Sequence, residues 1–185
     1  MDKGQLVSYL ERIDAALHDD AVIYIYGSGA FILLDEPGRT SLDIDIAAPY
    51  CHVNERDFRE AAALARLPVN PEFDSADDHI EWISALRLCL PKPTDDSDII
   101  LWQGQHLIVK TVSIPALIAS KLVRYDAGDR ADVQYLLTQH PVDYAEIEAG
   151  ARLLPSPFNQ DAVVLENLKN LKDDMLIWGE SHDGT

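Results

Sequence analysis

The feature that most constrains the fold is a pair of short strand-like segments separated by a glycine turn. Residues 21–26 form an apolar run of β-branched and aromatic side chains that ends at Gly27, as expected of a buried strand. Residues 28–34 have the pattern of a brief helix, which stops at the Asp-Glu-Pro-Gly sequence of residues 35–38. Residues 42–47 form the second strand-like segment. This order predicts a strand, a helix and a second strand within one α/β core.

The second of these strands carries two aspartates, although aspartate is a poor strand former. Side chains alternate along a strand, so Asp43 and Asp45 are predicted to share one face. Leu42, Ile44 and Ile46 are then predicted to point into the core. Carboxylates that share a face repel each other unless a cation lies between them. The pair therefore predicts a site for Mg²⁺, which prefers oxygen ligands and usually binds together with substrate phosphates.

The Gly-Ser sequence after the first strand supplies a second half for such a site. Gly27 lets the backbone approach a phosphate closely, and the hydroxyl of Ser28 adds a hydrogen-bond donor. The helix that begins here offers backbone N–H groups to an anion. Each half alone has an ordinary explanation, because a D-x-D strand can be a solvated outer face and a G-S-G sequence can be a tight turn. Together, in this order, they indicate a bound nucleoside triphosphate with its metal.

The other elements are predicted from apolar spacing and turn residues. They are a helix over residues 6–17, a helix over 54–67, a strand over 84–90, a hairpin of 99–102 with 106–112, and helices from residue 113 onward, the last capped by Asn159. An acidic loop is expected at 74–78. The predicted fold class is α/β, with a mixed, mostly antiparallel sheet flanked by helices. Residues 1–112 would form a catalytic portion and residues 113–185 a helical portion packed on it, as one compact unit.

Composition narrows the partners and the compartment. The chain has 15 basic and 32 acidic residues, a formal net charge of −17. Affinity for nucleic acid depends largely on clustered Lys and Arg, so a broad nucleic-acid surface is not expected, although RNA can still reach a small basic site. The two cysteines, Cys51 and Cys89, form no C-x-x-C sequence, and no apolar run is long enough to span a membrane. We expect a reduced, cytoplasmic protein with no membrane partner.

Two sequence stretches resemble a known group. Gly27-Ser28 followed by Asp43-Ile44-Asp45 resembles the signature of the DNA polymerase β-like nucleotidyltransferase superfamily. The nearest members are the AbiEii-like and minimal nucleotidyltransferase proteins of prokaryotic toxin–antitoxin and abortive-infection systems. Residues 119–124 and 129–133 are similar to the lysine helix and the "R-D-x-x-D" helix of those proteins. The resemblance covers roughly residues 20–138.

The resemblance implies a reaction and a set of site residues. The reaction is transfer of a nucleoside monophosphate from an NTP to an RNA or protein hydroxyl, in a toxin–antitoxin or phage-defence context. A cognate toxin or antitoxin protein is an expected partner. The implied site residues are Asp43 and Asp45 for Mg²⁺, and Gly27, Ser28 and Lys121 for the nucleotide.

A basic and acidic cluster near residue 121 forms the tentative part of that site. Lys121 has a flexible stem and a point charge that can reach a phosphate, and Arg124 and Asp132 can orient it. The alternative is an exposed helix face on which these residues form ordinary ion pairs.

The resembled superfamily normally places a third carboxylate on a neighbouring strand, as the base that activates the acceptor hydroxyl. The strand predicted at 84–90 carries none, and Asp78 and Glu81, just before it, are the candidates. This departure leaves a second function open, a catalytically weak or inactive protein of this fold that acts as an acidic antitoxin or interaction partner. A third possibility is an accidental match in an unrelated acidic α/β protein.

Overall fold

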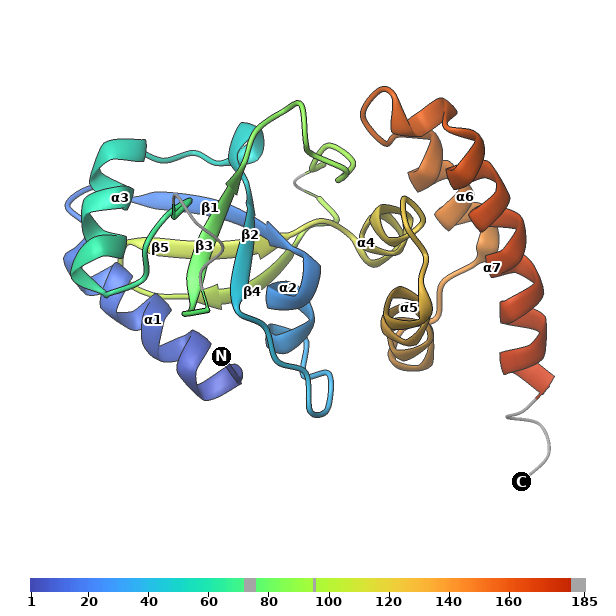
Figure 1. Cartoon of the computed structure of the whole chain (residues 1–185), viewed down its shortest axis with the longest axis horizontal. Helices are drawn as coiled ribbons and strands as arrows, with labels where there is room; N and C mark the ends of the chain where they lie inside the picture. The colour runs from blue at the N-terminus through green and yellow to red at the C-terminus, as the bar shows by residue number, and fades with distance from the viewer. Residues whose placement is uncertain (72–75, 95, 181–185) are drawn as a thin grey trace. The chain divides into compact units, whose positions relative to one another are not determined.

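The computed structural model describes residues 1–71, 76–94 and 96–180, and its fold is α/β with a helical C-terminal region (Figure 1). The chain divides into two compact units. The first comprises Met1–Leu88 and Pro93–Thr111, and the second comprises Cys89–Lys92 and the chain from Val112 onward. The division at Thr111 lies next to the boundary predicted at residue 112. That the two portions form one compact unit stays a prediction.

The first unit contains a five-stranded sheet in the order β3-β2-β1-β5-β4. The strands are β1 (Ala21–Tyr26), β2 (Asp43–Ala47), β3 (His79–Ile83), β4 (Ile99–Gln103) and β5 (Leu107–Thr111). β1 is antiparallel to β2 and parallel to β5, while β3 is parallel to β2 and β4 is antiparallel to β5. The sheet is therefore mixed, and the prediction of a mostly antiparallel sheet is wrong. Parallel pairs need long crossovers, and local periodicity does not encode them.

One hydrophobic core joins the sheet to three helices, α1 (Lys3–Ala16), α2 (Gly27–Leu33) and α3 (Glu55–Leu64). α1 and α3 lie side by side (Figure 1). Ile25 of β1 is paired with Ile46 of β2, and both side chains are buried in this core. The side chains that α1 and α3 turn to this core are also buried, namely Leu6, Leu10, Ile13, Phe58, Ala61 and Ala62. The alternate residues of β1 and β2 consequently lie on the opposite face of the sheet.

The prediction of a strand at residues 84–90 is wrong. These residues all lie in the described part of the chain and form turns and coil, and Leu86 is 93% exposed while Leu88 and Leu90 are buried. The strand in this region is β3, which pairs with β2 and also forms a hydrogen bond with Asn70. The amide of Trp82 donates to Oδ1 of Asn70 at 2.7 Å. The alternating leucines therefore mark two buried positions, but they do not form a strand.

Two smaller predictions also need correction. Leu42 is 51% exposed and precedes β2, so it does not point into the core. The last helix begins at Ala162 instead of at an Asn159 cap, and Asp161 Oδ1 accepts the amide of Val163 at 2.8 Å. Of the expected acidic loop at 74–78, residues 74 and 75 lie outside the described residues.

The second unit is helical. Its helices are α4 (Ile114–Lys121), α5 (Ala127–Gln139), α6 (Tyr144–Arg152) and α7 (Ala162–Glu180), with a short 3₁₀ segment, η2 (Phe158–Gln160). A further 3₁₀ segment, η1 (Ala48–Tyr50), follows β2 in the first unit. α4 begins after Ser113, where the helical part was predicted to start, and carries a proline in its first turn. Within the described residues, no helix combines the length and the apolar character needed to cross a membrane.

Candidate functional site

Asp43 and Asp45 lie on the face of β2 that points away from the hydrophobic core. Their neighbours Ile44 and Ile46 are core residues, so the alternation of the strand turns both carboxylates to the other face. Both aspartates are half-buried. The hydroxyl of Ser41 donates to Oδ1 of Asp43 at 2.6 Å. The structure therefore places the two predicted metal ligands on one face, with Ser41 as an additional contact.

Glu81 lies on the neighbouring strand, in register with this pair. β3 runs parallel to β2, with Asp45 opposite Glu81 and Asp43 opposite His79. Residues directly opposite each other on paired strands share a face, so Glu81 and Asp45 are neighbours on one face of the sheet. Glu81 accepts a hydrogen bond from the Arg87 guanidinium at 3.0 Å. The strand beside β2 thus carries a carboxylate, contrary to the expectation based on residues 84–90.

Asp78, the other candidate for a third acid, is directed elsewhere. It immediately precedes β3, and its Oδ2 accepts a hydrogen bond from the hydroxyl of Tyr9 on α1 at 3.2 Å. Its Oδ1 is 3.0 Å from the amino group of Met1. Of the two candidates, Glu81 is therefore the one in register with Asp45.

Gly27 brings the two halves of the sequence motif together. Its φ angle is +61°, a left-handed conformation that favours glycine. A Cβ atom at this position would overlap Oδ2 of Asp45 and lie 3.3 Å from Cγ of the same residue. The Asp45 carboxylate therefore packs directly against the backbone of the turn between β1 and α2. If Asp45 lay far from Gly27, the sequence match would be accidental. The two residues are instead adjacent.

Ser28 has a basic partner that the sequence did not single out. The guanidinium of Arg39, in the loop between α2 and β2, donates to Oγ of Ser28 at 2.8 Å. The Arg39 side chain is 25% exposed, and its guanidinium carbon lies 6.0 Å from the ring centroid of Phe31. The sequence feature that could have indicated this contact is an arginine four residues before Asp43. Arg39 places a guanidinium beside the Gly-Ser turn, and the Glu36 carboxylate, 3.8 Å from its Nε, partly compensates the charge.

Lys121 belongs to an ion-pair cluster in the second unit, formed with the buried residues Asp129 and Asp132 and with Arg124, whose side chain is 70% exposed. The Lys121 ammonium donates to Asp129 at 3.1 Å and also contacts Asp132, and all three residues are buried. Arg124 binds both carboxylate oxygens of Asp129, at 2.9 and 3.0 Å. Burial by itself would raise the pKa of Asp129, but the hydrogen bonds and charges of Arg124 and Lys121 outweigh it and hold that pKa below its ordinary value.

This arrangement differs from the exposed helix face of the alternative reading. The pairing of Lys121 with Asp132 is present, but the face that carries it is buried, whereas the alternative reading expected an exposed helix face. Asp129 contacts both bases and was not among the predicted site residues. The cluster has the composition of a buried structural network, and a contact of Lys121 with nucleotide stays a prediction.

The residues on β2 fit a metal ion that also binds its substrate. Among the described residues, no three His, Cys, Asp or Glu side chains form a group that could hold a metal. Mg²⁺ is commonly bound by one or two carboxylates, with substrate phosphates and water completing its shell. Asp43 and Asp45 match that arrangement, in which the protein alone supplies an incomplete set of ligands.

No protein-family model, curated protein or solved structure matches this chain. The resemblance to nucleotidyltransferases therefore rests on the sequence motifs alone.

Proposed function

We propose that this protein is a metal-dependent nucleotidyltransferase of the DNA polymerase β-like kind. It transfers a nucleoside monophosphate from an NTP to an RNA or protein hydroxyl and releases pyrophosphate. The observation that carries the proposal is the surroundings of Asp45, which packs against the backbone of Gly27 and lies in register with Glu81. The toxin–antitoxin or phage-defence context comes from the resemblance alone.

Each side chain of the site has a distinct role in this proposal. Asp43 and Asp45 hold Mg²⁺, which when bound neutralises phosphate charge and orients the leaving group. The missing side chain of Gly27 leaves room for the Asp45 carboxylate beside the turn, and Ser28 offers a hydroxyl to a phosphate. Arg39, already hydrogen-bonded to Ser28, presents a planar guanidinium suited to phosphate oxygens.

Glu81 is the proposed base. Transfer to a hydroxyl requires a group that positions the acceptor and takes its proton. Glu81 meets the positional requirement because it is next to Asp45 on the same face. Its ion pair with Arg87 involves an arginine side chain that is 70% exposed, so water and substrate compete with this pair readily.

The test is transfer of labelled NTP to total cellular RNA or protein in the presence of Mg²⁺. Glu81→Gln is expected to lower turnover by about 10²- to 10⁴-fold, the usual contribution of a general base, and to leave NTP affinity nearly unchanged. Glu60→Gln is the matched control, because Glu60 also pairs with an exposed arginine, on α3. Absence of transfer to every acceptor by the unmodified protein contradicts the proposed activity.

A second function is favoured by a different observation. Glu81 is paired with Arg87, and the chain carries a net charge of −17. A catalytically weak or inactive protein with this site would bind Mg-NTP and present an acidic surface to a toxin or another partner. Binding of Mg-NTP without transfer of label supports this second function over the first.

A further inference from the structure

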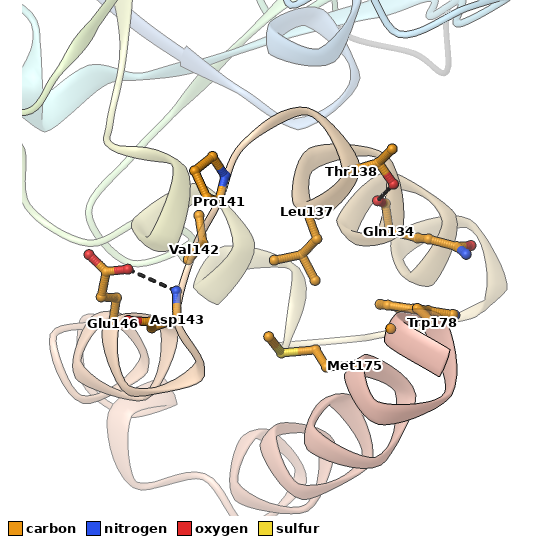
Figure 2. Close-up of a pocket in the computed structure, with 10 residues that line it drawn as sticks. Gln134, Leu137, Thr138, Pro141, Val142, Asp143, Glu146, Met175 and Trp178 are labelled. Carbon is orange, nitrogen blue, oxygen red and sulfur yellow. Dashed lines mark hydrogen bonds between the residues drawn. The ribbon is translucent and has the colours of Figure 1, made fainter. Parts of the chain in front are cut away.

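The second unit contains a groove that the proposed reaction does not use. Its walls are α5, the loop at 141–143, the start of α6 and the C-terminal part of α7 (Figure 2). Its volume is about 410 Å³, within the range of ligand sites in proteins. Leu137 of α5 and Met175 and Trp178 of α7 point into it from opposite walls. All three are half-buried, so the floor of the groove is apolar and accessible.

The apolar surface continues beyond the groove along α7. Leu176 and Ile177, between Met175 and Trp178, are 64% and 60% exposed. Four consecutive apolar residues at the end of one helix therefore combine a hollow with an exposed patch. Apolar patches of this kind on soluble domains mark sites of interaction.

The charged side chains that line the groove have one sign, although Lys172 of α7 lies nearby, 5.2 Å from the ring centroid of Tyr144. The charged lining residues are Asp143 and Glu146, both at the start of α6, where the Asp143 amide donates to the Glu146 carboxylate at 2.9 Å. Among the described residues that line the groove, none is basic. An occupant with positive charge at this end is therefore complementary to it. A second copy of this chain brings a further charge of −17, so self-association here is opposed by repulsion.

We propose that this groove binds a basic amphipathic helix of another protein. The apolar side chains of that helix would pack on Leu137, Met175 and Trp178, and a Lys or Arg at its edge would lie near Asp143 and Glu146. Grooves between helices receive such helices through apolar side chains spaced three and four residues apart. A methionine in the floor suits this role because its flexible thioether adapts to different side chains. The proposal does not depend on the nucleotidyltransferase activity.

The probe is a synthetic peptide of about 15 residues, roughly four helical turns, with Leu at helical spacing and Lys at the other positions. Its affinity for the full chain is measured by calorimetry. Trp178→Ala and Met175→Ala are each expected to weaken binding about tenfold or more, as for buried anchors of an interface. Leu165→Ala is the matched control, because Leu165 is a 51% exposed leucine of α7 that does not line the groove.

Two further measurements keep the result decisive. A peptide of the same composition with its helical spacing scrambled should bind at least about tenfold more weakly. Asp143→Asn keeps a side chain able to cap α6 and should weaken binding about twofold to fivefold, as for a partly exposed charge. Equal affinity of both peptides, or equal affinity of the Trp178 and Leu165 variants, overturns the proposal. So does a dimer of the unmodified chain in sedimentation that Trp178→Ala abolishes, because the occupant would then be a second copy.

Discussion

Two pairs of aspartates in this molecule lie in opposite environments. Asp129 and Asp132 of the second unit are buried, and the bases Lys121 and Arg124 bind them within hydrogen-bonding distance. Asp43 of the first unit is half-buried and accepts a hydrogen bond from a neutral hydroxyl, and Asp45 packs against the backbone of a glycine turn. Both pairs lie in the sequence stretches on which the proposed nucleotidyltransferase function rests.

This difference distinguishes a carboxylate that stabilises the fold from one that is able to bind a ligand. A buried carboxylate persists only if positive charge compensates it, and removal of one partner leaves an uncompensated charge. A pair on an accessible sheet face can remain in water until a cation and phosphates arrive. We infer that the buried aspartates hold the fold of the second unit and that Asp43 and Asp45 serve binding.

The largest expected effect is on the buried pair. Asp129→Asn removes a carboxylate that binds both Lys121 and Arg124, and it leaves the buried Lys121 with Asp132 as an acidic partner. It should lower the free energy of unfolding by about 3 kcal/mol. Glu148→Gln, which breaks an exposed ion pair with Arg152, should cost at most about 1 kcal/mol. Urea unfolding of both variants measures the difference. Equal costs would mean that the buried cluster does not stabilise the second unit.

A smaller difference between paired variants is expected at the glycine turn beside Asp45. Gly27→Ala and Gly38→Ala both place an L side chain at positive φ, which costs about 1–2 kcal/mol. Only the methyl group at position 27 meets Asp45, since nothing lies within 4 Å of a Cβ at Gly38. Gly27→Ala should therefore cost a further 1–3 kcal/mol or so and abolish Mg-NTP binding, while Gly38→Ala should leave binding intact. Calorimetric binding and unfolding that fail to separate the two variants would argue against close packing of Asp45 on the turn.

The smallest effect concerns a third environment, in which backbone amides compensate a carboxylate. Asp14 accepts the N–H groups of Gln105, His106 and Leu107. Burial by itself would raise the pKa of Asp14, but these hydrogen bonds outweigh it and lower that pKa. A lowered pKa stabilises the fold above the unfolded value of about 3.9, and this contribution is lost as the pH falls through the folded pKa.

Asp14→Asn should accordingly destabilise the protein by about 1 kcal/mol at pH 7. The difference from the unmodified chain should shrink below about pH 4, as Asp14 becomes protonated in the parent protein. Thermal unfolding between pH 7 and pH 3 measures it. A difference that stays constant over that range would show that the Asp14 charge contributes nothing.

Local pattern was enough to predict the first half of the sheet. The apolar run of β1, its end at Gly27 and the alternation of Asp43, Ile44 and Asp45 are all properties of neighbouring residues, and the structure has these elements in that order. The hairpin of β4 and β5 was predictable for the same reason. Each of these predictions needed only side-chain periodicity and a turn residue.

Contacts between distant segments were not predictable in this way. β3 is an edge strand that pairs with β2 across an intervening helix, and the regular leucines of residues 84–90 drew the strand prediction away from it. This error hid the register of Glu81 with Asp45. The contact of Arg39 with Ser28 and the burial of Lys121 depend on how loops and helices fold back, which residue spacing does not encode.

The most direct test of the proposed site is the thermal shift on adding Mg²⁺ and an NTP. A ligand that binds only the folded state raises its stability by about 2.7 kcal/mol at roughly 100 times its Kd. The unmodified chain should show this shift and Asp43→Asn/Asp45→Asn should not, although the double variant should be as stable as the parent or slightly more stable without metal. The control is Asp19→Asn/Asp20→Asn, which removes two exposed charges just before β1. It should shift like the parent. An equal shift in the Asp43/Asp45 variant would contradict a metal-nucleotide site on β2.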